Sequence, residues 1–161
     1  MFTTLIITMS SFTQVVPTES RTTEETARNI ITAIQHNSSD EYASLFPTIA
    51  EFHELMKQND KVYGPYSEEA RYEFEVDYER YLLPKVKSAF ESVIAEGKQK
   101  GIDWKRAKFV KADVVSHPSG AVTIGQVSVV FTVDSKEYIL RIDNALYLNS
   151  EWKVTQFLTL G

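Results

Sequence analysis

Residues 127–160, VSVVFTVDSKEYILRIDNALYLNSEWKVTQFLTL, decide the fold, because apolar and polar side chains alternate along them with a period of two. Such alternation is typical of β-strands that have one buried and one solvent-facing side. Two polar stretches, residues 134–136 and 149–150, interrupt the pattern with residues that favour tight turns. The sequence therefore predicts sequential antiparallel strands joined by short hairpins.

The predicted sheet has four strands and carries two polar positions on its apolar side. Asn144 and Gln156 each fall on a strand face that is otherwise apolar. A buried amide needs hydrogen-bond partners or water, so the two residues predict either a polar patch in a pocket or ordinary satisfied core amides. The predicted strands are residues 105–116, 122–133, 137–147 and 152–160.

Upstream of Gly101, apolar residues recur at steps of three and four, which is typical of amphipathic helices. The longest such stripe follows Ser67, a helix-capping residue, and either Gly97 or Gly101 is expected to end it. Pro84 lies inside this stripe and predicts a kink at residues 82–84, because proline removes a backbone hydrogen bond and clashes with the preceding turn. Shorter helices are predicted at residues 23–36, 40–46 and 48–58, with capping boxes at Thr22 and Glu25 and at Thr48 and Glu51.

Helices followed by a four-stranded meander resemble the cystatin-like cone of the nuclear transport factor two-like superfamily, which includes the SnoaL-like polyketide cyclases. The most similar stretch is residues 138–157, YILRIDNALYLNSEWKVTQF, in which a strand and a tight polar turn precede an aromatic–Lys–Val strand. The resemblance implies an α+β domain whose curved sheet wraps the long helix and leaves a conical pocket. Because members use this pocket for isomerisation, dehydration, hydrolysis or binding, the resemblance does not choose a function.

The composition predicts a globular chain of one domain. The sequence has 161 residues, a net charge of −5 and no cysteine. An acidic chain is a poor partner for a nucleic-acid backbone, whose phosphates require clustered Lys and Arg residues. The lack of cysteine excludes disulfides, thiolate metal sites and a cysteine nucleophile.

The N-terminal stretch is similar to the second half of a secretory signal. Residues 1–12, MFTTLIITMSSF, are apolar and then small, although the basic start of such a signal is missing. The stretch is shorter than the roughly 20 residues that span a bilayer, so no transmembrane segment is expected. We interpret residues 1–21 as a signal-peptide remnant or a disordered tail, with residues 17–21 as linker, and residues 22–161 as the domain. A periplasmic or secreted location is expected, with the cytoplasm as the alternative.

No motif in the chain predicts a metal site or a catalytic centre. His53 and Glu54 begin the HExxH pattern of zinc helices, but Lys57 takes the place of the second histidine. The acidic residues between positions 68 and 79 spread around a predicted helix, as on a solvated face. No Asp–His or Asp–Tyr arrangement matches the catalytic members of the superfamily that the chain resembles. We therefore expect no metal ion and no cofactor, and assign no catalytic residue.

Several tyrosines are candidates for ligand contact, because an aromatic ring with a polar tip suits a binding pocket. Tyr63 and Tyr66 lie in an expected loop that could close a pocket mouth, and Tyr78 lies on the apolar stripe of the long helix. Packing in the core or on the surface is the alternative role. The candidate ligand-binding residues are Tyr63, Tyr66, Tyr78, Tyr138, Asn144 and Gln156.

These observations favour a non-enzymatic domain that binds a small apolar ligand or a protein partner in the cone pocket. One alternative is a SnoaL-like isomerase, cyclase or hydrolase, which requires a titratable residue in the cavity with a perturbed pKa. Another is a structural domain that forms a homodimer through the outer face of the sheet. The residues expected on that face include Thr123, Ser128, Val130, Thr132 and Ile139.

Overall fold

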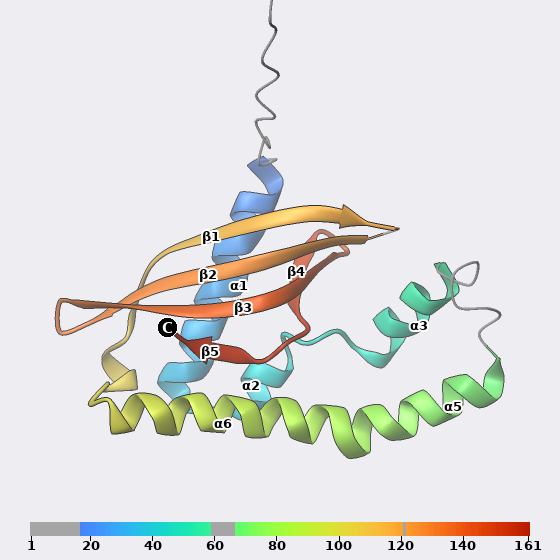
Figure 1. The fold of residues 1–161 in the computed structure, drawn as a ribbon, viewed down its shortest axis with the longest axis horizontal. Helices are drawn as coiled ribbons and strands as arrows, with labels where there is room; N and C mark the ends of the chain where they lie inside the picture. The colour runs from blue at the N-terminus through green and yellow to red at the C-terminus, as the bar shows by residue number, and fades with distance from the viewer. Residues whose placement is uncertain (1–16, 59–66, 121) are drawn as a thin grey trace, which may run out of the picture.

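The computed structural model describes residues 17–58, 67–120 and 122–161 (Figure 1). Helices come first and an antiparallel sheet follows, so the predicted α+β class is confirmed. Tyr63, Tyr66 and the loop expected at residues 59–65 lie outside the described residues. The helical elements are α1 (Pro17–His36), α2 (Ser39–Ala43), α3 (Ile49–Gln58), α5 (Glu68–Asp77), η1 (Tyr78–Leu82), α6 (Leu83–Gln99) and η2 (Trp104–Arg106). The strands are β1 (Lys108–Ser119), β2 (Val122–Val133), β3 (Lys136–Leu148), β4 (Glu151–Val154) and β5 (Leu158–Leu160).

The sheet has the order β1-β2-β3-β4, and β5 returns to pair with β3. The strand predicted at residues 152–160 is thus two strands, because residues 155–157 leave the ladder between them. At this point Thr155 donates its backbone N–H and its hydroxyl to the carbonyl oxygen of Asn144, at 3.2 and 2.8 Å. Gln156, predicted on the buried face, is exposed in this detour.

Both predicted hairpin turns are confirmed by their backbone angles. Asp134 and Ser135 have φ values of 52° and 66°, and Asn149 and Ser150 have φ values of 51° and 66°. Two consecutive residues with positive φ form the turn whose twist matches that of the flanking strands. These turns set the pairing of β2 with β3 and of β3 with β4.

A β-bulge in β3 changes which side chains face the core. Gly125 pairs with Ala145 and Val127 pairs with Ile142, so one residue of β2 faces two residues of β3. The extra residue reverses the alternation, and Ala145 is 1% exposed while Asn144 is half-buried. The predicted strict alternation is therefore wrong beyond Ile142.

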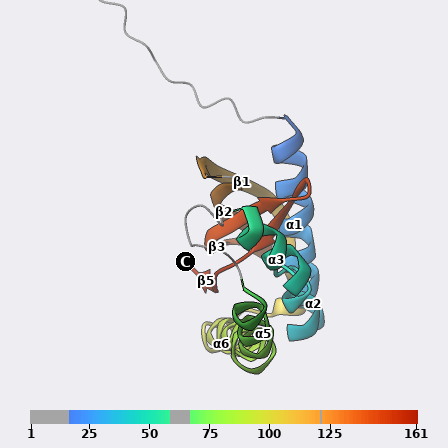
Figure 2. The ribbon, with the colours of Figure 1, turned by 90° about the vertical axis from the view of Figure 1, so that its right-hand side faces the viewer.

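The first helix, rather than the long one, lies across the sheet. Figure 1 shows α1 crossing behind the strands, and Figure 2 shows it along one face with α6 beyond the sheet edge. α1 packs mainly on β1 and β4, whereas α6 packs on β5. The core lies between these layers and includes Ile30, Ile34, Phe90, Phe131 and Leu140, each at most 1% exposed.

Both tryptophans pack on glycines that have no room for a side chain. The Trp104 ring covers Gly97, and its indole N–H donates to the carbonyl oxygen of Ile94 at 2.9 Å. The Trp152 ring covers Gly125, where an added Cβ atom would lie 2.7 Å from the ring. These contacts join α6 to η2 and β2 to β4.

The long helix is interrupted where its sequence predicts a kink. The backbone takes a π-helical turn at η1, and the N–H of Leu83 bonds to the carbonyl oxygen of Tyr78. This wider turn lies immediately before Pro84, which cannot donate to the normal helical partner. Gly101, with φ of 77°, follows the helix end, and the N–H of Ile102 donates to Gly97 at 2.8 Å.

The first helix begins earlier than its sequence predicts. α1 starts at Pro17, so residues 17–21 are helical and are not a linker. Proline suits the first turn of a helix, because the N–H that it lacks has no partner inside the helix. The capping box predicted at Thr22 and Glu25 therefore falls inside α1.

Candidate ligand-binding groove

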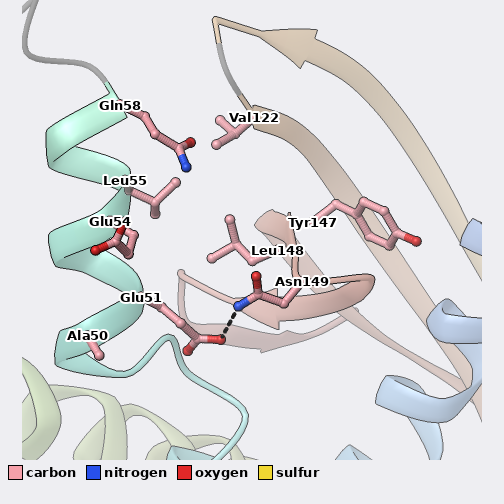
Figure 3. Close-up of a pocket in the computed structure, with 9 residues that line it drawn as sticks. All are labelled: Ala50, Glu51, Glu54, Leu55, Gln58, Val122, Tyr147, Leu148 and Asn149. Carbon is pink, nitrogen blue, oxygen red and sulfur yellow. Dashed lines mark hydrogen bonds between the residues drawn. The ribbon is translucent and has the colours of Figure 1, made fainter.

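A groove of about 380 Å³ separates α3 from the ends of β2 and β3 (Figure 3). Its walls combine apolar side chains with carboxylate and amide groups, a mixture typical of small-molecule sites. The residues that matter most are Glu51, Leu55 and Gln58 on α3, with Val122, Leu148 and Asn149 opposite.

α3 is held at this place by the cap of its first turn and by one aromatic residue. Thr48 and Glu51 form the predicted capping box. The backbone N–H and the hydroxyl of Thr48 donate to the Glu51 carboxylate at 2.7 and 3.0 Å, and the backbone N–H of Glu51 donates to the Thr48 hydroxyl oxygen at 3.2 Å. Phe52 packs within 6.0 Å, between ring centroids, of Phe46, Phe74 and Tyr78. No residue of α3 is fully buried, so its groove side stays accessible.

Glu51 is the most tightly surrounded carboxylate of the groove, and its side chain is 16% exposed. Its Oε2 atom accepts from the backbone N–H and the hydroxyl of Thr48, at 2.7 and 3.0 Å. Its Oε1 atom accepts from the Asn149 amide at 3.4 Å (Figure 3). The same atom lies 3.5 Å from the Lys153 ammonium. The contacts of Oε2 are therefore shorter than those of Oε1.

These contacts determine the charge of Glu51. Burial alone raises the pKa of a carboxyl, but the Thr48 donors, the Lys153 charge and the Asn149 amide outweigh it and hold the pKa of Glu51 below its ordinary value. The negative charge then acts on Tyr78, whose pKa is raised by burial and by Glu51. Glu51 is therefore ionised at neutral pH.

The ligand-binding residues predicted from the sequence do not gather at this groove. Tyr78 is 7% exposed in the core and donates its hydroxyl to the carbonyl oxygen of Pro47 at 2.8 Å. Tyr138 stacks on Phe131 with 5.4 Å between ring centroids. Among the six candidates, the four that lie in the described ranges, Tyr78, Tyr138, Asn144 and Gln156, are all absent from the groove walls.

The sequence does not reveal the groove residues, because residues far apart in the chain come together only in the tertiary structure. The sequence gives Glu51 a capping role and Asn149 a turn role, and both roles are confirmed. Nothing in the local pattern indicates that the start of α3 meets the β3–β4 turn.

The residues expected on the dimer face do not all lie on the same side of the sheet. Ser128, Val130 and Thr132 lie together on the outer side of β2, and Ile139 pairs with Val130. Thr123 is an odd number of residues from Ser128, so it points to the opposite side of the strand. Val130 is 5% exposed, and the more accessible apolar residue on this face is Val115, at 74%.

Within residues 17–58, 67–120 and 122–161, no three His, Asp or Glu side chains are placed to hold a metal ion. His53 contacts Phe74 and lies 3.6 Å from Glu75, outside the groove walls. No helix in these ranges is long and apolar enough to cross a membrane.

The fold and the groove define an α+β domain with a ligand-sized cleft between a helix and a β-hairpin end. No protein-family model matches the chain, and neither a curated protein nor a solved structure does so.

Proposed function

We propose that this domain is a non-catalytic binding module that holds a small, partly apolar ligand in the groove between α3 and the β3–β4 turn. The observation that carries the proposal is the pairing of an apolar middle, Leu55 and Leu148, with an ionised carboxylate. Thr48 holds this carboxylate by two hydrogen bonds, and Asn149 and Lys153 contact it at longer range. Groups fixed before a ligand arrives reduce the entropy lost on binding.

The state of Glu51 favours binding over proton transfer. A general base works best when its pKa lies near the operating pH, and the pKa of Glu51 is shifted in the opposite direction. A SnoaL-like reaction in this groove would have to use this weak base, the exposed Glu54 or Tyr147. A SnoaL-like enzymatic function is therefore the second candidate.

The proposal extends to the family and location of the chain. The order of helices and meander supports a cystatin-like cone, and the similarity of residues 1–12 to a signal supports export. Fractionation of bacteria that express the full chain would test export: recovery in the cytoplasm with an intact N-terminus would contradict it.

Fragment screening by two-dimensional NMR would test the binding function. We expect hits to shift the amide signals of Leu148 and Asn149, and to be recovered chemically unchanged. Leu148→Asp, which places a charge in the groove, should abolish these shifts, whereas Val115→Asp on the outer sheet face should not. Fragments that bind equally to both variants, or turnover that Glu51→Gln abolishes, would contradict the proposal.

A further inference from the structure

The charged side chains that line the groove are both acidic, and lysines outside its walls pair with them: Lys57 lies 2.8 Å from Glu54 and Lys153 lies 3.5 Å from Glu51. Among its described residues, Glu51 and Glu54 supply carboxylates, Gln58 and Asn149 supply amides, and no Lys, Arg or His contributes. A cation in the groove would be attracted to these carboxylates in competition with the two lysines, an anion would be repelled by them, and salt would screen both effects. The charge pattern thus complements a positively charged group.

Oε1 is the less tightly held oxygen of Glu51. A carboxylate has about four lone-pair sites, and Oε2 uses two of them for Thr48. The contacts of Oε1 with Asn149 and Lys153, at 3.4 and 3.5 Å, are long beside the roughly 2.7–2.9 Å of a charge-assisted hydrogen bond. Lys153 also has a second partner, Glu151 at 3.2 Å.

Apolar contacts continue from this oxygen along the groove. Glu51, Leu55 and Gln58 are spaced by four and three residues, so they share one face of α3. Figure 3 shows Leu55 and Leu148 facing each other across the groove, with Glu51 and Asn149 at one end and Gln58 and Val122 at the other. The two leucines therefore offer apolar surface to a chain of methylene groups.

We propose that the groove selects small amphipathic amines, with the ammonium group at Oε1 of Glu51 and the alkyl part between Leu55 and Leu148. The proposal rests on the binding function proposed above and adds the chemical class of the ligand. The ligand ammonium takes the place of Lys153 at Oε1 of Glu51, and Lys153 retains its ion pair with Glu151.

A matched set of probes tests this selection. Hexylamine, hexan-1-ol and hexanoate have the same alkyl chain and differ in head-group charge at pH 7. In NMR titrations of the full chain, we expect hexylamine to shift Leu148 and Asn149 with an affinity about tenfold above that of hexan-1-ol, and hexanoate not to bind. Raising the salt concentration should weaken hexylamine alone.

Two variants separate the charge from the fold. Glu51→Gln keeps the capping box, since Gln also serves at this position, and should reduce hexylamine affinity to that of hexan-1-ol. Asn149→Asp adds a carboxylate at a turn position that Asp tolerates, and should strengthen hexylamine binding. Lys98→Gln at the end of α6, outside the groove walls, is the control and should change neither affinity.

The results of these titrations distinguish the proposal of amine selection from the broader proposal of a binding module. Equal binding of hexylamine and hexan-1-ol in the groove, or tighter binding of hexanoate, would overturn amine selection and leave the binding module intact. Hexylamine that binds Glu51→Gln as tightly as wild type would also overturn it. No shift at the groove with any of the three probes would overturn amine selection, and the fragment screen would then decide the broader proposal.

Discussion

Gly125 illustrates how one missing side chain sets the packing of a whole hairpin. The Trp152 ring occupies the space where a Cβ atom would stand, and Val114 approaches the same point from β1. Neither neighbour is the free end of a flexible chain. The close contact therefore requires glycine at this position of β2.

We predict that Gly125→Ala lowers the free energy of unfolding by about 1–3 kcal/mol, the usual cost of overpacking a core. The gain of roughly 0.4–1 kcal/mol from a stiffer unfolded chain is smaller. Urea denaturation followed by tryptophan fluorescence would measure the change. Ser128→Ala on the outer face of the same strand is the control, and equal stability of both variants would refute the prediction.

Glu51 predicts a specific response to acid. A carboxyl whose pKa is lower in the folded than in the unfolded state stabilises the fold above its ordinary pKa of 4.5, and this contribution disappears as the pH falls through the folded value. Glu51→Gln lacks the contribution at every pH. The difference in unfolding free energy between wild type and variant should therefore be largest near neutrality and shrink below pH 4.5.

Urea denaturation at a series of pH values would measure this difference. Glu91→Gln, at an exposed position of α6, provides the comparison for removing a negative charge elsewhere. A difference for Glu51→Gln that stays constant from pH 7 to pH 3 would show that Glu51 contributes through its shape and not through its charge.

At the scale of single elements, the sequence predicts local features well because their causes are local. The cap at Ser67, which accepts from the N–H of Ala70 at 3.1 Å, and the interruption before Pro84 each depend on neighbouring residues. The bulge at residues 143–144 and the detour at residues 155–157 were missed, because they depend on the partner strand. An alternating pattern in one strand cannot show where a single residue of the neighbouring strand faces two of its residues.

Two helix ends allow a matched prediction. Gly101 and Asn37 follow α6 and α1 with φ values of 77° and 53°, and both ends have the same pair of closing hydrogen bonds. Gly101→Ala should cost about 1 kcal/mol, although no atom lies within 4 Å of the added Cβ, because a side chain disfavours this backbone conformation.

Asn37→Gly should have the opposite sign, or no effect, since glycine accepts positive φ more readily than asparagine does. Thermal denaturation of both variants would provide the comparison. If Gly101→Ala is as stable as wild type while Asn37→Gly is destabilised, backbone conformation does not control these helix ends.

For the whole molecule, the α+β class was predictable because the period of the apolar residues changes near Gly101. The placement of the helices on the sheet was not predictable in the same way. A stripe on α1 and a stripe on α6 are both apolar, and only the three-dimensional packing shows that α1 takes the sheet face. The groove depends on this arrangement, because α2 and α3 continue from the end of α1.

Phe131 tests whether the layers unfold as one unit. It is fully buried and stacks on both Trp104 and Tyr138, at 5.5 and 5.4 Å between ring centroids. Phe131→Ala should lower the free energy of unfolding by about 3–5 kcal/mol. The transitions by tryptophan fluorescence and far-ultraviolet circular dichroism should still coincide, as in a two-state protein. Tyr72→Ala, at a position 69% exposed on α5, should stay within about 0.5 kcal/mol of wild type.

The position of α1 has a consequence for synthesis of the protein on the ribosome. The Thr26 hydroxyl of α1 donates to the carbonyl oxygen of Trp152 at 3.1 Å, across 126 positions of the chain. α1 thus leaves the ribosome long before β4, one of its native partners. Before β4 emerges, α1 can pack on α2, η2 and β1, but its contacts with β4 are still missing, so the domain completes its folding only after β4 has left the ribosome.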